Sequence, residues 1–231
     1  MRFGRKKSTG ADEVEVDSLS EAEPTTEDVA PGARTSGPWD STEVQLDPEQ
    51  AGNRIDLGGL VVTGHPELEM QLQVDEATGT VLAVVLAGEQ GAVELRPFAA
   101  PRNGDIWADV RRQLAAEVAQ HGGTADEGEG LWGTELRVMM PVELPDGQHA
   151  TQPSRVLGIT GPRWLLRATL FGEPALEPAE DGLIESALRE VVVVRGDAAM
   201  SPGEPIPMQV PADAQRIDGP DGSNGPDGID A

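Results

Sequence analysis

Two arginines in one apolar segment are the residues whose type and spacing best suit binding chemistry. Residues 161–172 read Gly-Pro-Arg-Trp-Leu-Leu-Arg-Ala-Thr-Leu-Phe-Gly. If the segment is a strand, its alternation puts Trp164 and Leu166 on one face and Arg163 and Arg167 on the other. A guanidinium group binds carboxylate and phosphate through paired N–H donors. The two arginines therefore either pair with carboxylates of the protein or bind an anionic ligand.

A second charged pair has the same two-residue spacing. Glu135 and Arg137 alternate with apolar residues in what we predict to be another strand. If that strand lies beside the first, the four charged side chains form a ladder of exposed pairs, each worth about 0.2–1 kcal/mol. The alternative is an anion-binding patch formed by Arg163 and Arg167 with Arg137 and Glu135. We favour the ladder, because a chain this acidic supplies internal partners freely.

We predict no catalytic residue. A nucleophile needs a nearby base, and the histidines that could serve, His65, His121 and His149, stand in no recognised motif. We expect these histidines to be structural or exposed. Their spacing matches no HxH or HExxH pattern, so a transition-metal site is not expected. The chain has no cysteine, which excludes disulfides and thiolate chemistry.

No cofactor is predicted either. Gly122-Gly123 and Gly128-Glu129-Gly130 do not match the glycine-rich loops that bind phosphate between a strand and a helix. The acidic run 126–129 lacks the alternating oxygen ligands of a calcium loop. We interpret this run as a solvated loop, which is the usual state of such runs.

The charge of the chain limits its partners. A formal net charge of −24 argues against duplex DNA or an anionic membrane as the main partner. The first ten residues carry four basic side chains, whereas residues 11–50 carry twelve acids against Arg34. We expect this basic start to be a disordered terminus rather than an RNA or membrane contact. No apolar run is long enough for a signal peptide or a membrane span, so we expect no membrane insertion and a cytoplasmic protein.

Composition divides the chain into three parts. Residues 1–36 are mostly small, polar and acidic, and we predict that they are disordered because they cannot bury enough apolar surface. Residues 212–231 are rich in Gly, Pro and Asp and are predicted to be a disordered acidic tail. Between them, residues 37–211 are predicted to form a single domain.

The middle region has the pattern of an α+β domain. Apolar residues recur at four-residue steps after Asp105, which predicts a helix that begins at this cap and ends at Gly122-Gly123. A second helix is predicted over 180–190. Strands are predicted at 60–62, 68–74, 81–87, 92–98, 136–140, 155–160, 163–171 and 191–195. Short links between strands imply a mainly antiparallel sheet, and we expect both helices to pack on one of its faces.

Seven segments resemble an uncharacterised actinobacterial family, domain of unknown function 3710. The resemblance runs through residues 37–211 in sequence order. Its segments are Gly-Pro-Trp-Asp at 37–40, Arg-Ile-Asp-Leu-Gly-Gly-Leu at 54–60, Phe-Ala-Ala-Pro-Arg at 98–102 with Ile-Trp at 106–107, Gly-Thr-Glu-Leu at 133–136, Gly-Pro-Arg-Trp-Leu-Leu-Arg at 161–167, Val-Val-Val-Val-Arg-Gly at 191–196 and Pro-Ile-Pro at 205–207. The family implies no activity or site residue. The order of elements also resembles the Mog1/PsbP-type sandwich, which implies a mainly non-enzymatic binding domain.

Two functions follow as the main hypotheses, and a third, less favoured one is an enzyme with an unfamiliar carboxylate site, which would need paired acids in a concave pocket. The first is a cytosolic, non-enzymatic interaction or adaptor domain with an unidentified protein partner. The alternative is a domain that binds a small anionic ligand or a nucleotide through arginines on one sheet face. The position of Arg163 and Arg167 relative to Glu135 distinguishes internal pairing from an exposed anion site.

Overall fold

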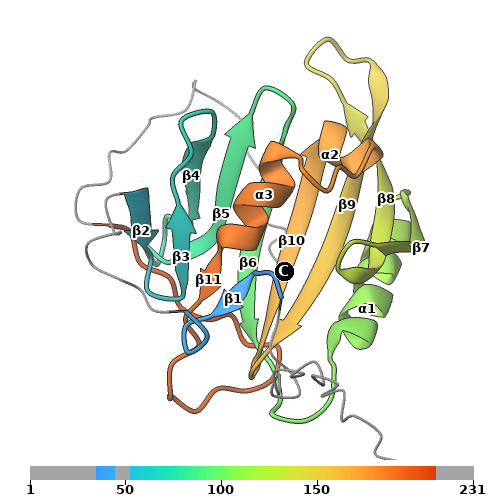
Figure 1. The fold of residues 1–231 in the computed structure, drawn as a ribbon. Helices are drawn as coiled ribbons and strands as arrows, with labels where there is room; N and C mark the ends of the chain where they lie inside the picture. Colours follow the sequence, from blue (N-terminus) through green and yellow to red (C-terminus); the bar gives the residue numbers. More distant parts are fainter. Residues whose placement is uncertain (1–34, 45–52, 212–231) are drawn as a thin grey trace, which may run out of the picture. The chain divides into compact units, whose positions relative to one another are not determined.

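A seven-stranded antiparallel sheet carries most of the described chain in this computed structural model (Figure 1). Residues 35–44 and 53–211 are described. The strands of this large sheet, in spatial order, are β4 (Glu69–Val74), β5 (Val81–Gly88), β6 (Gly91–Ala99), β10 (Trp164–Gly172), β9 (His149–Gly161), β8 (Gly133–Glu143) and β7 (Thr124–Gly130). The predictions of disorder for 1–36 and 212–231 fall outside the described residues, except at Thr35 and Ser36.

A smaller sheet of four strands joins segments that are far apart in the sequence. Its order is β1 (Trp39–Asp40), β11 (Val192–Val193), β3 (Leu60–Thr63) and β2 (Arg54–Asp56). β1 pairs with β11 in parallel, whereas the other pairs are antiparallel. The buried indole of Trp164 donates a hydrogen bond to Oδ2 of Asp40 at 2.7 Å. This bond links the small sheet to β10.

Three helices accompany the sheets within the described residues, and the two longer ones match the predicted pair. They are α1 (Trp107–Gln120), α2 (Glu173–Leu176) and α3 (Leu183–Glu190). Together with the mainly antiparallel sheets, they confirm the predicted α+β class. The four-residue α2 was not predicted. No helix within residues 35–44 and 53–211 combines the length and apolar character needed to cross a bilayer.

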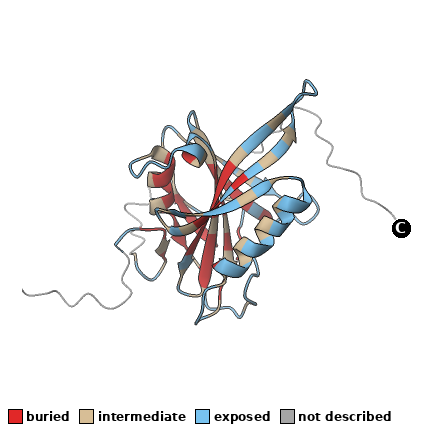
Figure 2. Ribbon diagram, turned by 90° about the vertical axis from the view of Figure 1, so that its right-hand side faces the viewer, coloured by how far each residue is buried: buried red, intermediate tan, exposed pale blue. Residues whose placement is uncertain are grey.

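The large sheet buries a hydrophobic core on each face. One core lies under the small sheet and α3, and the alternating residues of β10 supply its centre: Trp164, Leu166, Ala168 and Leu170. The other lies under α1 and includes Trp107, Leu136, Val156 and Leu165. Figure 2 shows that buried residues concentrate in the strands, whereas α1 is largely exposed on its outer side. The two helices therefore lie on opposite faces, not on one face as expected.

Two local features differ from the sequence prediction. The acidic run 126–129 belongs to β7, which pairs with β8 along its whole length, so it is an edge strand and not a loop. His149, one of the histidines expected to be structural or exposed, is the first residue of β9 and is exposed. Asp105 does accept a hydrogen bond at the start of α1, from the amide of Trp107 at 2.8 Å, although the residue with cap geometry is Ile106.

The residues of two turns explain where α1 and β4 end, in agreement with the predicted ends of this helix and strand. Gly122 follows α1 with a φ of 77°, which favours glycine, and this agrees with the predicted helix end. Asp75 follows β4, and its Oδ1 accepts hydrogen bonds from the amides of Ala77 and Thr78. The bond from the Thr78 amide holds the pKa of the Asp75 carboxyl below its ordinary value.

Candidate functional site

Arg163 lies in the turn between β9 and β10. Its φ is 65°, in the left-handed region that side-chain-bearing residues seldom adopt. Its carbonyl oxygen accepts hydrogen bonds from the amide of Ala100 at 2.8 Å and from Nε of Arg195 at 3.2 Å. Arg163 is thus a turn residue whose backbone holds neighbouring segments, whereas the alternation placed it on the strand face with Arg167.

Arg167 does lie in β10, half-buried on the face next to α1. Its guanidinium carbon stands 5.4 Å from the centre of the Phe98 ring. Its Nε is buried without a hydrogen-bond partner in the described structure. Burial lowers the pKa of Arg167, and the nearby charge of Arg96 adds to this effect, against the opposing influence of Glu94 and Glu117.

Glu135 and Arg137 lie on the opposite face, in a charged cluster beside α3. Arg137 Nε is 3.3 Å from Glu135 Oε1. Arg155 of β9 joins Glu135 at 3.6 Å and Glu185 of α3 at 3.0 Å. These last three side chains are essentially inaccessible to solvent, at 0–1% exposure. Sequence reasoning missed Arg155 and Glu185, because arginine and glutamate are seldom fully buried.

The predicted ladder across the two strands does not form. β9 lies between β8 and β10, so Glu135 and Arg137 are two strands away from Arg167. Strand register also puts Arg167 opposite Gly158, on the side of α1, and Leu170 opposite Arg155, on the side of α3. The four predicted site residues therefore occupy three separate places.

A cavity of about 440 Å³ opens among the described residues. It lies where the ends of β8 and β9, the start of α1 and residues 36–37 meet. Its lining consists of Ser36, Gly37, Asp105, Trp107, Arg111, Trp132, Gly133, Thr134, Gly158, Ile159 and Thr160. Its volume is within the range of about 300–1,000 Å³ typical of ligand sites.

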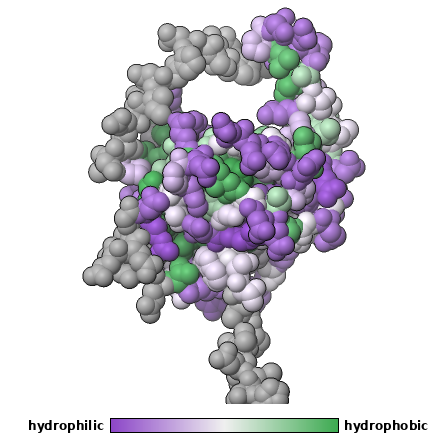
Figure 3. Space-filling view, turned by 45° about the horizontal axis from the view of Figure 1, so that its top comes forward, coloured by the Kyte–Doolittle hydropathy of each residue, from purple (hydrophilic) through white to green (hydrophobic). Residues whose placement is uncertain are grey.

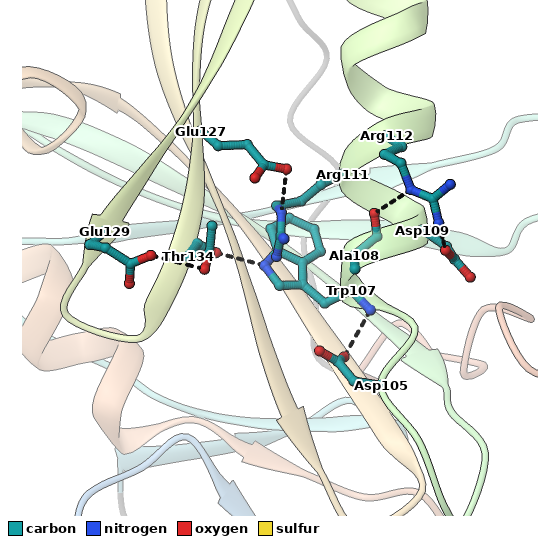
Figure 4. A network of polar contacts seen from close by, with 9 residues as sticks. All are labelled: Asp105, Trp107, Ala108, Asp109, Arg111, Arg112, Glu127, Glu129 and Thr134. Atoms are coloured by element: carbon teal, nitrogen blue, oxygen red, sulfur yellow. Dashed lines mark hydrogen bonds and ion pairs between the residues drawn. The ribbon is translucent and has the colours of Figure 1, made fainter.

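Trp107 forms one wall of this cavity and is held on every side. Its ring packs directly on Gly158, where an added Cβ would lie 2.1 Å from a ring carbon, so only glycine fits. Its Nε1 donates to the carbonyl oxygen of Thr134 at 2.7 Å, and the guanidinium of Arg111 lies 5.5 Å from the ring centre (Figure 4). Trp107 is therefore a fixed surface.

Trp132 forms another wall and is less tightly held. It lies in the turn between β7 and β8 and is half-buried. Its Nε1 donates to the carbonyl oxygen of Gly37 at 3.5 Å, the long end of a hydrogen bond. The guanidinium of Arg189 lies 5.5 Å from its ring centre. This indole is only partly buried and lines the cavity.

Asp105 provides the negative charge of the cavity. Its Oδ1 accepts the amide of Trp107 at 2.8 Å and the hydroxyl of Thr160 at 3.3 Å. No basic side chain pairs with Asp105 among the residues that the structure describes. The other charged residue of the wall, Arg111, is matched by Glu127, with Nε 2.9 Å from Oε1 (Figure 4). A carboxylate beside indole rings attracts a cation.

Sequence reasoning named Asp105 only as a helix cap and did not group the two tryptophans. Trp107 and Trp132 are separated by a helix and a strand, and only the fold brings them to one cavity. The sequence offered no local pattern that links the two tryptophans. In the described part of the chain, no cluster of three or more His, Cys, Asp or Glu side chains could hold a metal ion.

The chain belongs to the family described as Protein of unknown function (DUF3710), which matches residues 37–217. No curated protein matches it. Among solved structures, the solution structure of cyanobacterial PsbP (CyanoP) from Synechocystis sp. PCC 6803 is similar at 11% identity, covering 61% of this chain and 91% of that chain, with a TM-score of 0.35.

Proposed function

For this member of the family, we propose a non-enzymatic interaction domain of a cytosolic protein, which binds a basic side chain of a protein partner in the tryptophan-lined cavity. The observation that carries the proposal is the carboxylate of Asp105, which has no basic partner in the described structure and lies beside Trp107 and Trp132. A lysine or arginine of the partner would pair with this carboxylate and lie against the Trp132 ring.

The character of the cavity supports an interaction site. Tryptophan and arginine are enriched among the residues that dominate the energy of protein interfaces. Trp107 is held by Gly158, Thr134 and Arg111, so binding need not order it. A preorganised surface loses less entropy when a partner binds.

The charge of the whole chain favours a basic partner as well. With a net charge of −24, the chain attracts positively charged segments and repels acidic ones. The face drawn in Figure 3 is mostly hydrophilic, with hydrophobic residues in small groups. An interface that depends on one inserted basic side chain and a charged rim suits such a surface better than one that depends on a broad apolar contact.

The indole N–H signals in a proton–nitrogen NMR spectrum provide a direct test. A short arginine-glycine peptide should shift the signals of Trp132 and Trp107 and leave those of Trp39 and Trp164 unchanged, because the last two lie outside the cavity lining. The same peptide with citrulline in place of arginine should bind about tenfold more weakly or worse, because it lacks the charge. Equal binding of both peptides would refute the proposal.

A matched pair of variants tests the carboxylate. Asp105→Asn keeps an oxygen that can cap α1 but removes the charge, whereas Asp109→Asn makes the same change of net charge on an exposed residue of α1. We expect Asp105→Asn to lose the arginine peptide and Asp109→Asn to keep it. In affinity capture from native lysate, a stoichiometric partner should be retained by Asp109→Asn and lost by Asp105→Asn. Retention by both variants would count against the cavity as the site.

A further inference from the structure

Two arginines are neighbours on one face of the large sheet, outside the tryptophan-lined cavity. Arg96 of β6 and Arg167 of β10 are direct partners in the antiparallel register, on the face next to α1. Directly opposed residues have Cβ atoms only about 4.5–5.5 Å apart, and like charges at such positions destabilise a sheet. This pairing therefore calls for a compensating negative charge.

Of the two arginines, only Arg96 has a direct ion pair or side-chain hydrogen bond among the described residues. Nε of Arg96 is 2.7 Å from Oε1 of Glu94, and its Nη2 donates to Oε1 of Gln73 at 3.2 Å. Arg167 has no hydrogen bond or ion pair within the described residues, and its buried Nε lacks a partner. The ring of Phe98 supports its guanidinium at 5.4 Å without neutralising it.

We propose that Arg96 and Arg167 together bind a phosphate group. Each guanidinium has five N–H donors, and Arg96 uses only Nε and Nη2 in the contacts above. A phosphate can accept from both forks at once and brings a charge close to −2. A carboxylate is the weaker candidate, because it would have to compete with Glu94, which already offers one to Arg96.

The sheet restricts both arginines before any ligand binds. Both arginines project from rigid strands in the interior of the sheet, since β6 and β10 are each paired on both sides. The guanidinium carbon of Arg167 lies 5.4 Å from the centre of the Phe98 ring, and this contact restricts its fork before binding. Glu94 and Glu117 lie near enough to influence Arg167, which limits affinity for an isolated anion.

Thermal unfolding of the full chain tests the site with inorganic phosphate as the probe. We expect phosphate to raise the midpoint temperature above that in chloride or acetate of equal ionic strength. Arg167→Gln should abolish this increase, and titration calorimetry should show phosphate binding at least tenfold weaker. Arg112→Gln, which makes the same charge change at an exposed residue, should retain it. The increase is compared within each variant, so a lower stability of Arg167→Gln does not obscure the result.

Each other outcome contradicts the inference. An equal increase in wild type and Arg167→Gln would show that phosphate acts elsewhere, and an equal effect of acetate would exclude a phosphate-specific site. The inference does not depend on the proposed function, because neither arginine lines the cavity. Asp105→Asn should therefore keep the phosphate response, whichever way the peptide experiment falls.

Discussion

Arg155 holds two carboxylates in the interior, and its removal should be more damaging than that of any surface arginine. Glu135 and Glu185 are both within ion-pair distance of Arg155, at 3.6 and 3.0 Å. Arg155→Met would leave two acids buried without their shared partner, at an expected cost of about 3–5 kcal/mol in the free energy of unfolding. Urea unfolding followed by tryptophan fluorescence measures this loss.

Two further variants serve as comparisons for the stability loss of Arg155→Met. Arg112→Met removes an exposed arginine paired with Asp109 and should cost less than about 1 kcal/mol. Combining Arg155→Met with Glu135→Gln and Glu185→Gln should recover much of the stability, because no buried charge then remains unpaired. A loss no larger than that of Arg112→Met would show that the cluster does not depend on Arg155.

The same residues show what strand alternation predicts and what it cannot. A period of two correctly assigned Trp164, Leu166, Ala168 and Leu170 to a core face, because side-chain direction depends on local geometry alone. It could not identify the partners of Arg167 or Glu135, because these depend on strand order. β9 separates their strands, and the sequence carries no local record of that insertion.

At the scale of elements, the hairpin of β8 and β9 extends beyond its neighbours. β7 pairs with β8 only as far as Met139, and β10 pairs with β9 only as far as Ser154. The hairpin beyond these residues has two strand edges without a paired strand in the described structure. Each edge carries a proline, Pro141 or Pro153, which has no amide N–H to offer another strand.

Replacing these prolines should make the hairpin associate with other copies of the chain. We expect the double variant Pro141→Thr and Pro153→Thr to form dimers or larger species as concentration rises, because threonine restores a donor and favours strands. Light scattering coupled to size-exclusion chromatography measures this. Pro145→Thr, in the turn at the tip of the hairpin, is the control and should behave like wild type. No difference in mass between the double variant and the control would contradict this role.

Element prediction failed where tertiary pairing overrides local preference. The segment Asp-Glu-Gly-Glu at 126–129 has little strand propensity, yet it forms the middle of β7 because β8 provides a complete row of hydrogen-bonding partners. By contrast, the four-residue apolar spacing of α1 predicted that helix well. Its stripe is a local pattern, and the adjacent sheet face simply covers it.

At the scale of the whole molecule, the segment after β11 seals the main core. Ile206 and Met208 are buried, and Met208 forms a bridge with Val81. A chain that ends at Gly203 should be less stable than one that ends at Pro211, by about 2–5 kcal/mol for each of the two side chains lost. Thermal unfolding of the two truncated chains compares them directly. Equal midpoint temperatures would mean that this segment does not contribute to the core.

The arrangement in two sheets could not be predicted from the sequence, because the small sheet joins segments that are far apart in the chain. β1 and β11 have two residues each and are separated by about 150 residues of chain, so no periodic pattern marks their pairing. The mainly antiparallel large sheet, in contrast, follows from its hairpins, such as β5–β6 and β9–β10, which short turns enforce. The hairpins between consecutive strands could be predicted, whereas the closure of the small sheet, the pairing of β1 with the distant β11, could not.

That closure has a consequence for the protein as it is synthesised. β11 lies between β1 and β3, so these two strands cannot be joined in one sheet until Val192 and Val193 have been synthesised. At a synthesis rate of about 5–20 residues per second, β1 waits roughly 8–30 seconds for its partner. During this interval β3 has β2 on one edge but lacks β11 on the other, and a chaperone that binds exposed nascent segments would find that edge unpaired. The small sheet is therefore completed only after β11 has been synthesised.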